Sequence, residues 1–167
     1  MTGTVLITGA NRGIGLKLAE CYAADSWQVV ATSRDPKSSD SLQHIASSLP
    51  GKLEIEQLDV SNDESIAQLG KILAGRPIHL LINNAGSYQS KYLGFEDIDP
   101  DTWLTEMRVN TIAPFMVTRA LLDNLCAAGQ SIVATLSSQM GSITDNRSGG
   151  SYSYRSSKAG LNAVIKS

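Results

Sequence analysis

The stretch TVLITGANRGIG at residues 4–15 joins an apolar, β-branched run to a glycine-rich turn, and an amphipathic helix is predicted to begin at Ile14. Glycines let a backbone turn sharply and approach a pyrophosphate, and the first helical turn adds free N–H groups and a partial positive charge. The spacing is G-x-x-x-G-x-G instead of the commoner G-x-G-x-x-G. An ordinary glycine-rich turn is the alternative, but the flanking strand and helix favour a phosphate loop. The predicted dinucleotide contacts here are Thr8, Gly9, Asn11, Arg12, Gly13, Ile14 and Gly15.

The rest of the chain alternates short apolar runs with longer amphipathic ones, which is typical of βαβ units around a parallel sheet. The predicted strands are Thr4–Thr8, Gln28–Thr32, Leu53–Gln57, Ile78–Ile82 and Ile132–Leu136. The predicted helices are Ile14–Ala24, Ser39–Ser48, Asp63–Leu73 and Asp101–Cys126, and another begins near Tyr152. The expected fold class is α/β, with a Rossmann-like, doubly wound parallel sheet and helices on both faces. Residues 1–167 are expected to form a single domain.

Several helix boundaries carry local signals. Ser61 and Glu64 have the spacing of a capping box, which predicts Ser61 as the N-cap of the third helix. Asp99 before Pro100 suits an N-cap followed by proline at the first helical position. Pro114 lies inside the long fourth helix and is expected to bend or split it, because proline lacks the N–H that the helix needs.

Composition and charge exclude several classes of function. The chain has 14 basic and 16 acidic side chains, and the basic ones are scattered, so no dense positive face for nucleic acid or an anionic membrane is expected. Cys21 and Cys126 are too few for a disulfide framework. No secretory signal, membrane-spanning stretch or metal-ligand spacing is visible, so a cytoplasmic protein without a metal is expected.

The end of the second predicted strand favours one nicotinamide cofactor. An NAD site usually has an acidic residue there for the ribose hydroxyls, whereas this chain has Thr32-Ser33-Arg34. A guanidinium suits a 2′-phosphate, and Arg12 in the glycine loop supplies a second positive charge. The alternative is that both arginines are ordinary solvated charges, and Asp35 beside Arg34 is positioned to neutralise it in part. Ser33 and Arg34 are predicted to bind NADP(H), with NAD(H) possible.

Two further strand ends contribute predicted cofactor contacts. Asp59 and Val60 follow the third strand, where the adenine is expected. Asp59 either accepts a hydrogen bond from the adenine amino group or belongs to the turn before the next helix, and both interpretations stay open. The fourth strand ends in Asn83-Asn84-Ala85-Gly86, where small residues allow close approach to the cofactor and amides tie strand ends together. Asn84, Ala85 and Gly86 are predicted contacts.

A candidate acid–base group opens the last helix. Tyr154 and Lys158 stand at i and i+4, on one face. A free tyrosine with a pKa near 10 is a poor acid or base at neutral pH, and an ammonium roughly 5 Å away stabilises the phenolate by about 3 kcal/mol, so Lys158 is expected to lower the pKa of Tyr154. Ser137 and Ser138 follow the fifth strand, where a hydroxyl is placed to bind a carbonyl oxygen. Asn110 is a mediocre helix former near Pro114.

These motifs together resemble the short-chain dehydrogenase/reductase family. The resemblance rests on T-G-x-x-x-G-x-G at 8–15, N-N-A-G at 83–86, Asn110, Ser138 and Y-x-x-x-K at 154–158, in the family's order. The segment 136–160 is most similar to the subgroup of sniffer-type carbonyl reductases and bacterial C-factor. The resemblance implies a carbonyl reductase or alcohol dehydrogenase that uses NADP(H) and acts on a small aldehyde, ketone or alcohol.

The resemblance also implies roles for particular residues. Tyr154 would be the general acid for reduction and the base for oxidation. Lys158 would lower its pKa and hold the nicotinamide ribose, Ser138 would orient the carbonyl, and Asn110 would position a water for proton relay. The family commonly forms homo-oligomers through its fourth helix and the Tyr–Lys helix. A non-catalytic dinucleotide-binding or interaction module is the alternative, and a receiver-like domain using Asp59 is disfavoured because no acidic pair follows the first strand.

The chain departs from the family pattern at its C-terminus. A doubly wound fold of this type has roughly six strands, and five are predicted here. We therefore expect a C-terminally incomplete chain that lacks the last strands and the substrate-binding segment. Such a chain is expected to leave its fifth strand as an exposed edge and to bind cofactor more readily than it turns over.

Overall fold

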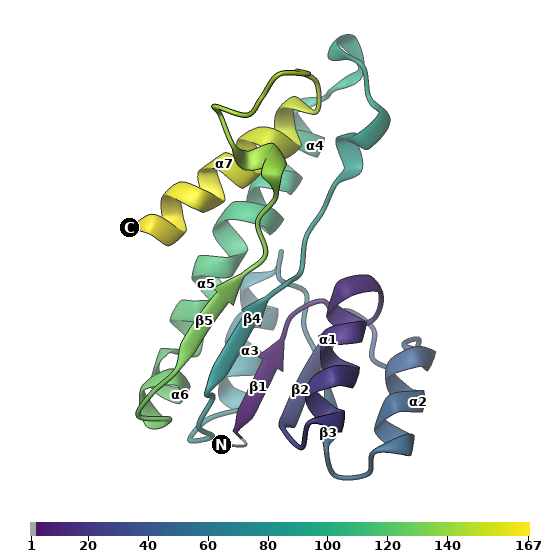
Figure 1. Cartoon of the computed structure of the whole chain (residues 1–167), viewed down its shortest axis with the longest axis vertical. Coiled ribbons are helices and arrows are strands. Elements are labelled where there is room, and N and C mark those ends of the chain that lie inside the picture. Colours follow the sequence, from purple (N-terminus) through teal and green to yellow (C-terminus); the bar gives the residue numbers. More distant parts are fainter. Residues whose placement is uncertain (1–2) are drawn as a thin grey trace.

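The computed structural model describes residues 3–167 as a five-stranded parallel sheet flanked by helices (Figure 1). The strands are β1 (Thr4–Ile7), β2 (Gln28–Ser33), β3 (Leu53–Gln57), β4 (Leu80–Asn83) and β5 (Ile132–Thr135). Their order in the sheet is β3-β2-β1-β4-β5, and every neighbouring pair is parallel. Strand order reverses between β1 and β4, as in a doubly wound dinucleotide-binding fold. The predicted fold class is confirmed.

Side chains alternate along the central strands between two apolar layers. Leu6 in β1 packs into one cluster with α3 (Asp63–Ile72), α5 (Ala113–Ala120) and α6 (Leu122–Ala127). Its neighbours Val5 and Ile7 pack into the other, with α1 (Gly13–Ala24) and α2 (Asp40–Ser48). Because successive side chains of a strand point to opposite faces, a continuous apolar run serves a sheet that is covered on both sides.

The predicted long fourth helix is divided. It consists of α4 (Pro100–Met107), a π-helical turn η3 (Arg108–Ile112), then α5 and α6. Pro114 has no N–H to return to the carbonyl of Asn110, and the N–H of Ala113 instead bonds the Arg108 carbonyl, five residues back. Asp99 caps α4 as predicted, with its carboxylate accepting the N–H groups of Asp101 and Thr102.

Two sequence predictions need correction. The N-cap of α3 is Asn62, whose Oδ1 accepts the N–H of Ser65 at 2.8 Å, and not Ser61. The Ser61 hydroxyl instead donates to Asp59, 2.6 Å away. The capping-box spacing was therefore misleading by one residue, because Asn62 is an equally good cap. Strand β4 also begins two residues later than predicted, at Leu80 instead of Ile78.

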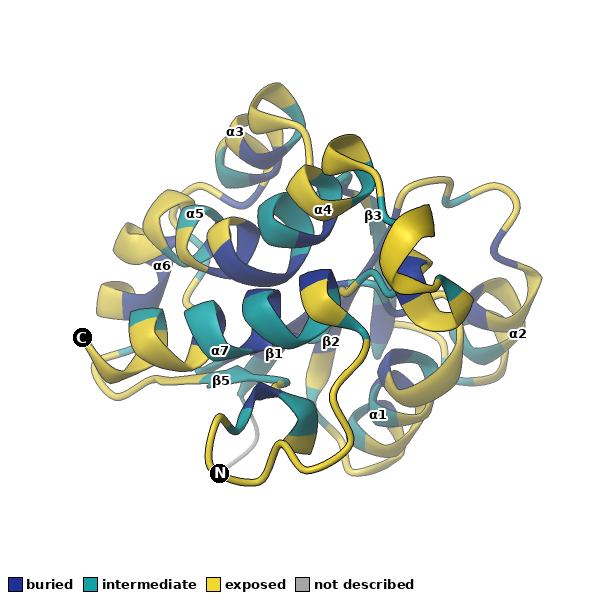
Figure 2. Ribbon diagram, turned by 90° about the horizontal axis from the view of Figure 1, so that it is seen from above, coloured by how far each residue is buried: buried dark blue, intermediate teal, exposed yellow. Residues whose placement is uncertain are grey.

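The last helix, α7 (Tyr152–Lys166), packs along α4 and η3 with its buried side toward them (Figure 2). Short 3₁₀ turns lie in the connections before it: η1 (Gln89–Tyr92), η2 (Phe95–Asp97) and η4 (Gln139–Gly141). Within residues 3–167, β5 pairs with β4 alone, and Ile132 on it is 65% exposed, as expected for an edge strand. None of the helices in this described part is long and apolar enough to cross a membrane.

Candidate active site

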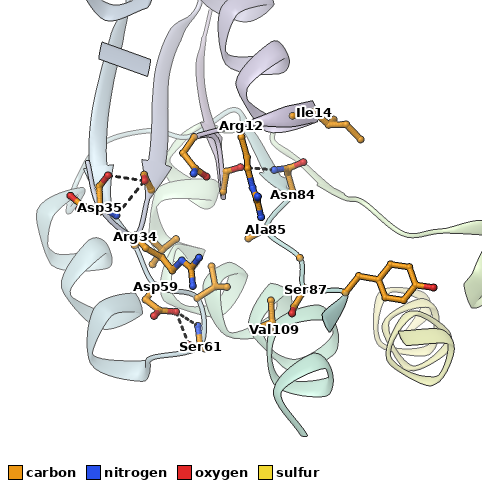
Figure 3. A pocket seen from close by; sticks show the side chains of 18 of the residues that line it. Arg12, Ile14, Arg34, Asp35, Asp59, Ser61, Asn84, Ala85, Ser87 and Val109 are labelled. Carbon is orange, nitrogen blue, oxygen red and sulfur yellow. Dashed lines mark hydrogen bonds between the residues drawn. The ribbon is translucent and has the colours of Figure 1, made fainter. Parts of the chain in front are cut away.

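A cavity of about 1110 Å³ opens at the carboxyl ends of the strands, where the strand order reverses (Figure 3). This is the place where open α/β sheets bind ligands. Twelve of the residues predicted to bind cofactor line it: Gly9, Asn11, Arg12, Gly13, Ile14, Ser33, Arg34, Asp59, Val60, Asn84, Ala85 and Gly86. The structure thus brings together segments that are far apart in the sequence, such as Thr8 and Ala85, which are 77 positions apart.

The glycine loop is shaped for the close approach of a ligand. Gly9 has φ +64°, and a Cβ on it would lie 2.9 Å from the Cα of Ala85. A Cβ on Gly15 would lie 2.4 Å from Nδ2 of Asn84. In the described part of the chain, no side chain caps the N-terminus of α1, so its first N–H groups stay available for an anion. These features fit a pyrophosphate.

Hydrogen bonds lock this loop to the end of β4. The Thr8 hydroxyl oxygen accepts the N–H groups of Asn84 and Ala85, each at 3.0 Å. The side-chain amide of Asn84 donates to the carbonyls of Thr8 and Gly9, each at 2.9 Å. The sequence predicted that an amide of this motif ties strand ends together. Thr8 and Gly15 therefore lie behind the cavity lining as supports.

Two arginines extend toward the cavity from different strand ends (Figure 3). Arg12 belongs to the glycine loop and Arg34 follows β2. The Asp35 carboxylate accepts the N–H groups of Lys37 and Ser38 and closes a local turn, while its partial neutralisation of Arg34 stays a prediction. A hydrogen bond from Ser38 is the main reason that the pKa of Asp35 is lowered. Within residues 3–167 neither guanidinium group forms an ion pair, so both remain available to an anionic ligand.

Asp59 serves the turn before α3 and also lines the cavity. Its Oδ1 accepts the N–H of Ser61 at 2.9 Å and the hydroxyl of the same residue. Burial works to raise the pKa of Asp59, but the hydrogen bonds from Ser61 and the charge of Arg34 lower it overall. The turn interpretation of Asp59 is thus supported by its contacts, and a contact with adenine stays a prediction.

The predicted catalytic side chains gather beside this cavity, around the start of α7. Ser138, just beyond the end of β5, lies close enough to the Tyr154 hydroxyl to lower its pKa against the effect of burial. Lys158 lies one turn along α7, with Nζ 5.9 Å from the centre of the Tyr154 ring. Ser137 is turned away, since its hydroxyl contacts Oδ1 of Asn162 at 2.6 Å. Ser138 is therefore the serine that shares a site with the phenol.

The expected effect of Lys158 on Tyr154 does not hold in this structure. Burial raises the pKa of Tyr154, the hydrogen bond with Ser138 opposes this, and the nearby Tyr88 and Glu106 raise it further. The Lys158 ammonium donates instead to the carbonyl of Leu136, 2.8 Å away. Burial also lowers the pKa of Lys158. Sequence spacing placed both groups on one face, but it carried no information on which acceptor the ammonium reaches.

Asn110 sits in the π-helical turn, and its amide connects the site to neighbouring segments. Oδ1 accepts the N–H of Ser87 at 2.8 Å, and Nδ2 donates to the carbonyl of the same residue and to the Ser157 hydroxyl. Asn110 is fully buried. Its predicted part in proton relay stays a prediction, but the structure places it between the β4 end and α7.

Comparison with known proteins decides the family. A family model described as short chain dehydrogenase matches residues 3–167. The chain belongs to the short-chain dehydrogenase family. Protein FixR of Bradyrhizobium diazoefficiens is 31% identical over 170 residues, which cover 97% of this chain and 59% of FixR. C-signal of Myxococcus xanthus is 37% identical over 91 residues, which cover 54% of each protein. The chain thus spans somewhat more than half the length of these relatives.

Solved structures agree with this assignment. The crystal structure of an NADPH-bound carbonyl reductase from chicken fatty liver has a TM-score of 0.87 and 35% sequence identity, and the match covers 98% of this chain and 71% of the reductase. The resemblance to this family, which the order of motifs indicated, is confirmed.

Sequence reasoning missed some residues of the site. Tyr88 lines the cavity and stacks on Tyr154, and Glu106 is fully buried beneath the same loop, holding Ser90. The position of Glu106 among apolar residues of a predicted helix was the signal that would have indicated a buried polar contact, because Glu is almost never fully buried without partners. Tyr88 follows the N-N-A-G motif closely, but its stacking depends on how the connection after β4 meets the first turn of α7.

Proposed function

We propose that this short-chain dehydrogenase is an NADP(H)-dependent reductase that converts a small aldehyde or ketone to an alcohol, or catalyses the reverse reaction. The observation that carries the proposal is that Ser138, Tyr154 and Lys158 lie together next to Tyr88, which lines the same cavity as the glycine loop and two arginines. The NADPH in the chicken carbonyl reductase supports the choice of cofactor. A cytoplasmic location, where NADPH favours reduction, accords with it.

The cavity residues divide between the two ends of the cofactor. The backbone N–H groups at the start of α1 would hold the pyrophosphate, and Arg12 and Arg34 would pair with a 2′-phosphate. The Lys158 ammonium, part-buried at the nicotinamide side, would hold the ribose there. When bound, NADPH supplies the hydride that reduces the carbonyl carbon.

The chain's own side chains would handle the carbonyl oxygen. The Ser138 hydroxyl donates a hydrogen bond to that oxygen and so fixes its position beside the phenol. Tyr154 donates its hydroxyl proton to the same oxygen as negative charge develops on it. The raised pKa keeps Tyr154 protonated before reaction, so the proton is present for transfer, although a lower pKa would make the phenol a stronger acid. Asn110 would keep the end of β4 and α7 in register around this site.

Substitution Tyr154→Phe tests the proposal. The variant should lose NADPH oxidation with a simple aryl aldehyde by at least about a hundredfold, because general acid catalysis contributes about 10²–10⁴-fold. NADPH binding, followed by fluorescence titration, should stay within about twofold of wild type. Tyr92→Phe, at a tyrosine that is 88% exposed, is the matched control and should keep full activity. Equal activity in both variants would contradict the assigned role, and cofactor binding without any turnover would favour a non-catalytic dinucleotide-binding module.

We further propose that the chain forms a homo-oligomer through α4–α5 and α7. Support comes from apolar side chains exposed along the first two helices, such as Leu104 and Phe115, which are 66% and 53% exposed. Apolar patches of this kind mark association surfaces. Sedimentation velocity of the purified chain should give a species larger than a monomer, and Phe115→Glu should shift it to the monomer.

A further inference from the structure

Tyr88 lies flat against the proposed acid. The rings of Tyr88 and Tyr154 are stacked with their centres 4.0 Å apart and an angle of 18° between their planes. One ring belongs to the segment after β4 and the other to the first turn of α7, so the contact joins segments 66 positions apart in the sequence. A stacked partner covers one face of the phenol ring and restricts how the ring tilts.

Two buried side chains fix the backbone on either side of Tyr88. The side-chain amide of Asn110 forms hydrogen bonds with both the N–H and the carbonyl of Ser87, each at 2.8 Å. Glu106 accepts the N–H of Ser90 at 2.9 Å and the hydroxyl of Ser90 with both carboxylate oxygens. Glu106 and Asn110 are four positions apart and both are fully buried. They therefore clamp the residue before Tyr88 and the residue two after it.

The tip of the Tyr88 side chain is held as well. Its hydroxyl is hydrogen-bonded to the Ser151 hydroxyl at 2.5 Å, immediately before α7 begins. Ser151 has φ +48°, a left-handed conformation that few non-glycine residues adopt. The ring is thus fixed at both backbone flanks and at its far end, which is more restraint than packing alone requires.

We infer that Tyr88 is a positioning residue for the proposed reaction: clamped by Asn110, Glu106 and Ser151, it holds the Tyr154 ring so that the phenol hydroxyl stays directed at Ser138. The inference rests on the proposed role of Tyr154 as the acid. A misplacement of the reacting group by about 1 Å can cost about a hundredfold in rate, which gives such a restraint a clear function.

The electrostatic surroundings of Tyr154 agree with a shielded, protonated phenol. The titratable groups that face it are Tyr88 from the β4 connection, Glu106 from α4 and Lys158 from its own helix. Burial is the main cause of its raised pKa, and the Tyr88 ring supplies part of that burial. Loss of the ring should therefore hydrate the phenol and bring its pKa down toward the ordinary value of 10.0.

The test is NMR titration of the chain labelled with ¹³Cζ-tyrosine, which contains five tyrosines. Tyr154→Phe identifies the Tyr154 signal. We expect Tyr88→Leu to shift that signal and to lower the pKa of Tyr154, while Tyr88→Phe, which keeps the ring, restores both most of the way to wild type. Tyr92→Leu, the same change at an exposed tyrosine, should leave both as they are. An unchanged Tyr154 signal and pKa in Tyr88→Leu would overturn the inference.

Two further readouts keep the result decisive. In the unmutated chain, nuclear Overhauser contacts between the Tyr88 and Tyr154 rings are expected, and their absence would overturn the inference even if Tyr88→Leu fails to fold. With NADPH and an aryl aldehyde, Tyr88→Leu should lower kcat about tenfold with little change in KM, since it displaces the acid. A higher KM at unchanged kcat would show that Tyr88 only lines the substrate site and does not position Tyr154. If the chain turns nothing over, the proposed function fails while the NMR result still decides the role of Tyr88.

Discussion

At the scale of single residues, Tyr154 and Lys158 lie one helical turn apart, with the ammonium 5.9 Å from the ring centre, but they have different neighbours. Burial raises the pKa of Tyr154 against the influence of the nearby Ser138, and the Lys158 ammonium donates to the Leu136 carbonyl. Negative charge that develops on the substrate oxygen would compete with the Leu136 carbonyl for the Lys158 ammonium. The raised pKa means that Tyr154 is protonated at neutral pH, as general acid catalysis of a reduction would require at its start.

Asp59 should make the stability of the chain sensitive to acid. Its folded pKa is lower than the ordinary 3.8, so its contribution is fully present well above pH 3.8 and is lost as the pH falls through the folded pKa. Asp59→Asn cannot titrate. The difference in the free energy of unfolding between wild type and Asp59→Asn, measured with urea, should therefore shrink between about pH 5.5 and about pH 3. A difference that stays constant over this range would contradict the hydrogen bonds from Ser61 as its source.

The candidate site was predictable where its residues belong to a short motif of consecutive residues. Gly9, Asn84 and Arg34 are examples, since each follows a strand in a motif whose position the sheet then fixes. The Tyr88–Tyr154 stack and the Glu106–Ser90 contact were not predictable, because they depend on how the irregular connection after β4 packs against α7 and α4. The acceptor of Lys158 was missed for the same reason.

At the scale of elements, the broken fourth helix shows how one proline shapes a site. Pro114 withholds an N–H, the preceding turn widens to π-helical geometry, and that turn carries Asn110. Sequence predicted the break, because the missing N–H of proline is a local property. It did not predict the π turn, whose formation depends on how α4 and α7 pack around it.

The cap of α3 provides a direct test at this scale. Asn62→Ala should lower the free energy of unfolding by about 1 kcal/mol, because it leaves the N–H of Ser65 without its acceptor. Ser61→Ala should cost less, since it removes no helix cap. Urea denaturation of the two variants gives the comparison. A greater loss in Ser61→Ala would restore the capping box that the sequence indicated.

At the scale of the whole molecule, the sheet order brings the carboxyl ends of β1, β2, β3 and β4 together, so that twelve of the predicted cofactor residues line one cavity. Alternating strands and helices predicted this arrangement correctly, since right-handed parallel crossovers leave few other topologies. The sequence also predicted β5 as an exposed edge, which follows from counting strands. Strand and helix boundaries were less accurate, as at Leu80, because apolar residues continue past the ends of the hydrogen-bonded ladder.

We propose that this chain folds into a cofactor-binding unit in which Arg12 and Arg34 bind the 2′-phosphate of NADP(H). Parallel fluorescence titrations of the purified 167-residue chain with NADPH and NADH test it most directly, with Arg34→Ala beside the wild type. We predict saturable binding that favours NADPH by about tenfold or more, and a preference that largely disappears in Arg34→Ala, since a charged hydrogen bond contributes about 1.5–3 kcal/mol. Tighter binding of NADH, or an NADPH preference that survives Arg34→Ala and Arg12→Ala together, would contradict the claim.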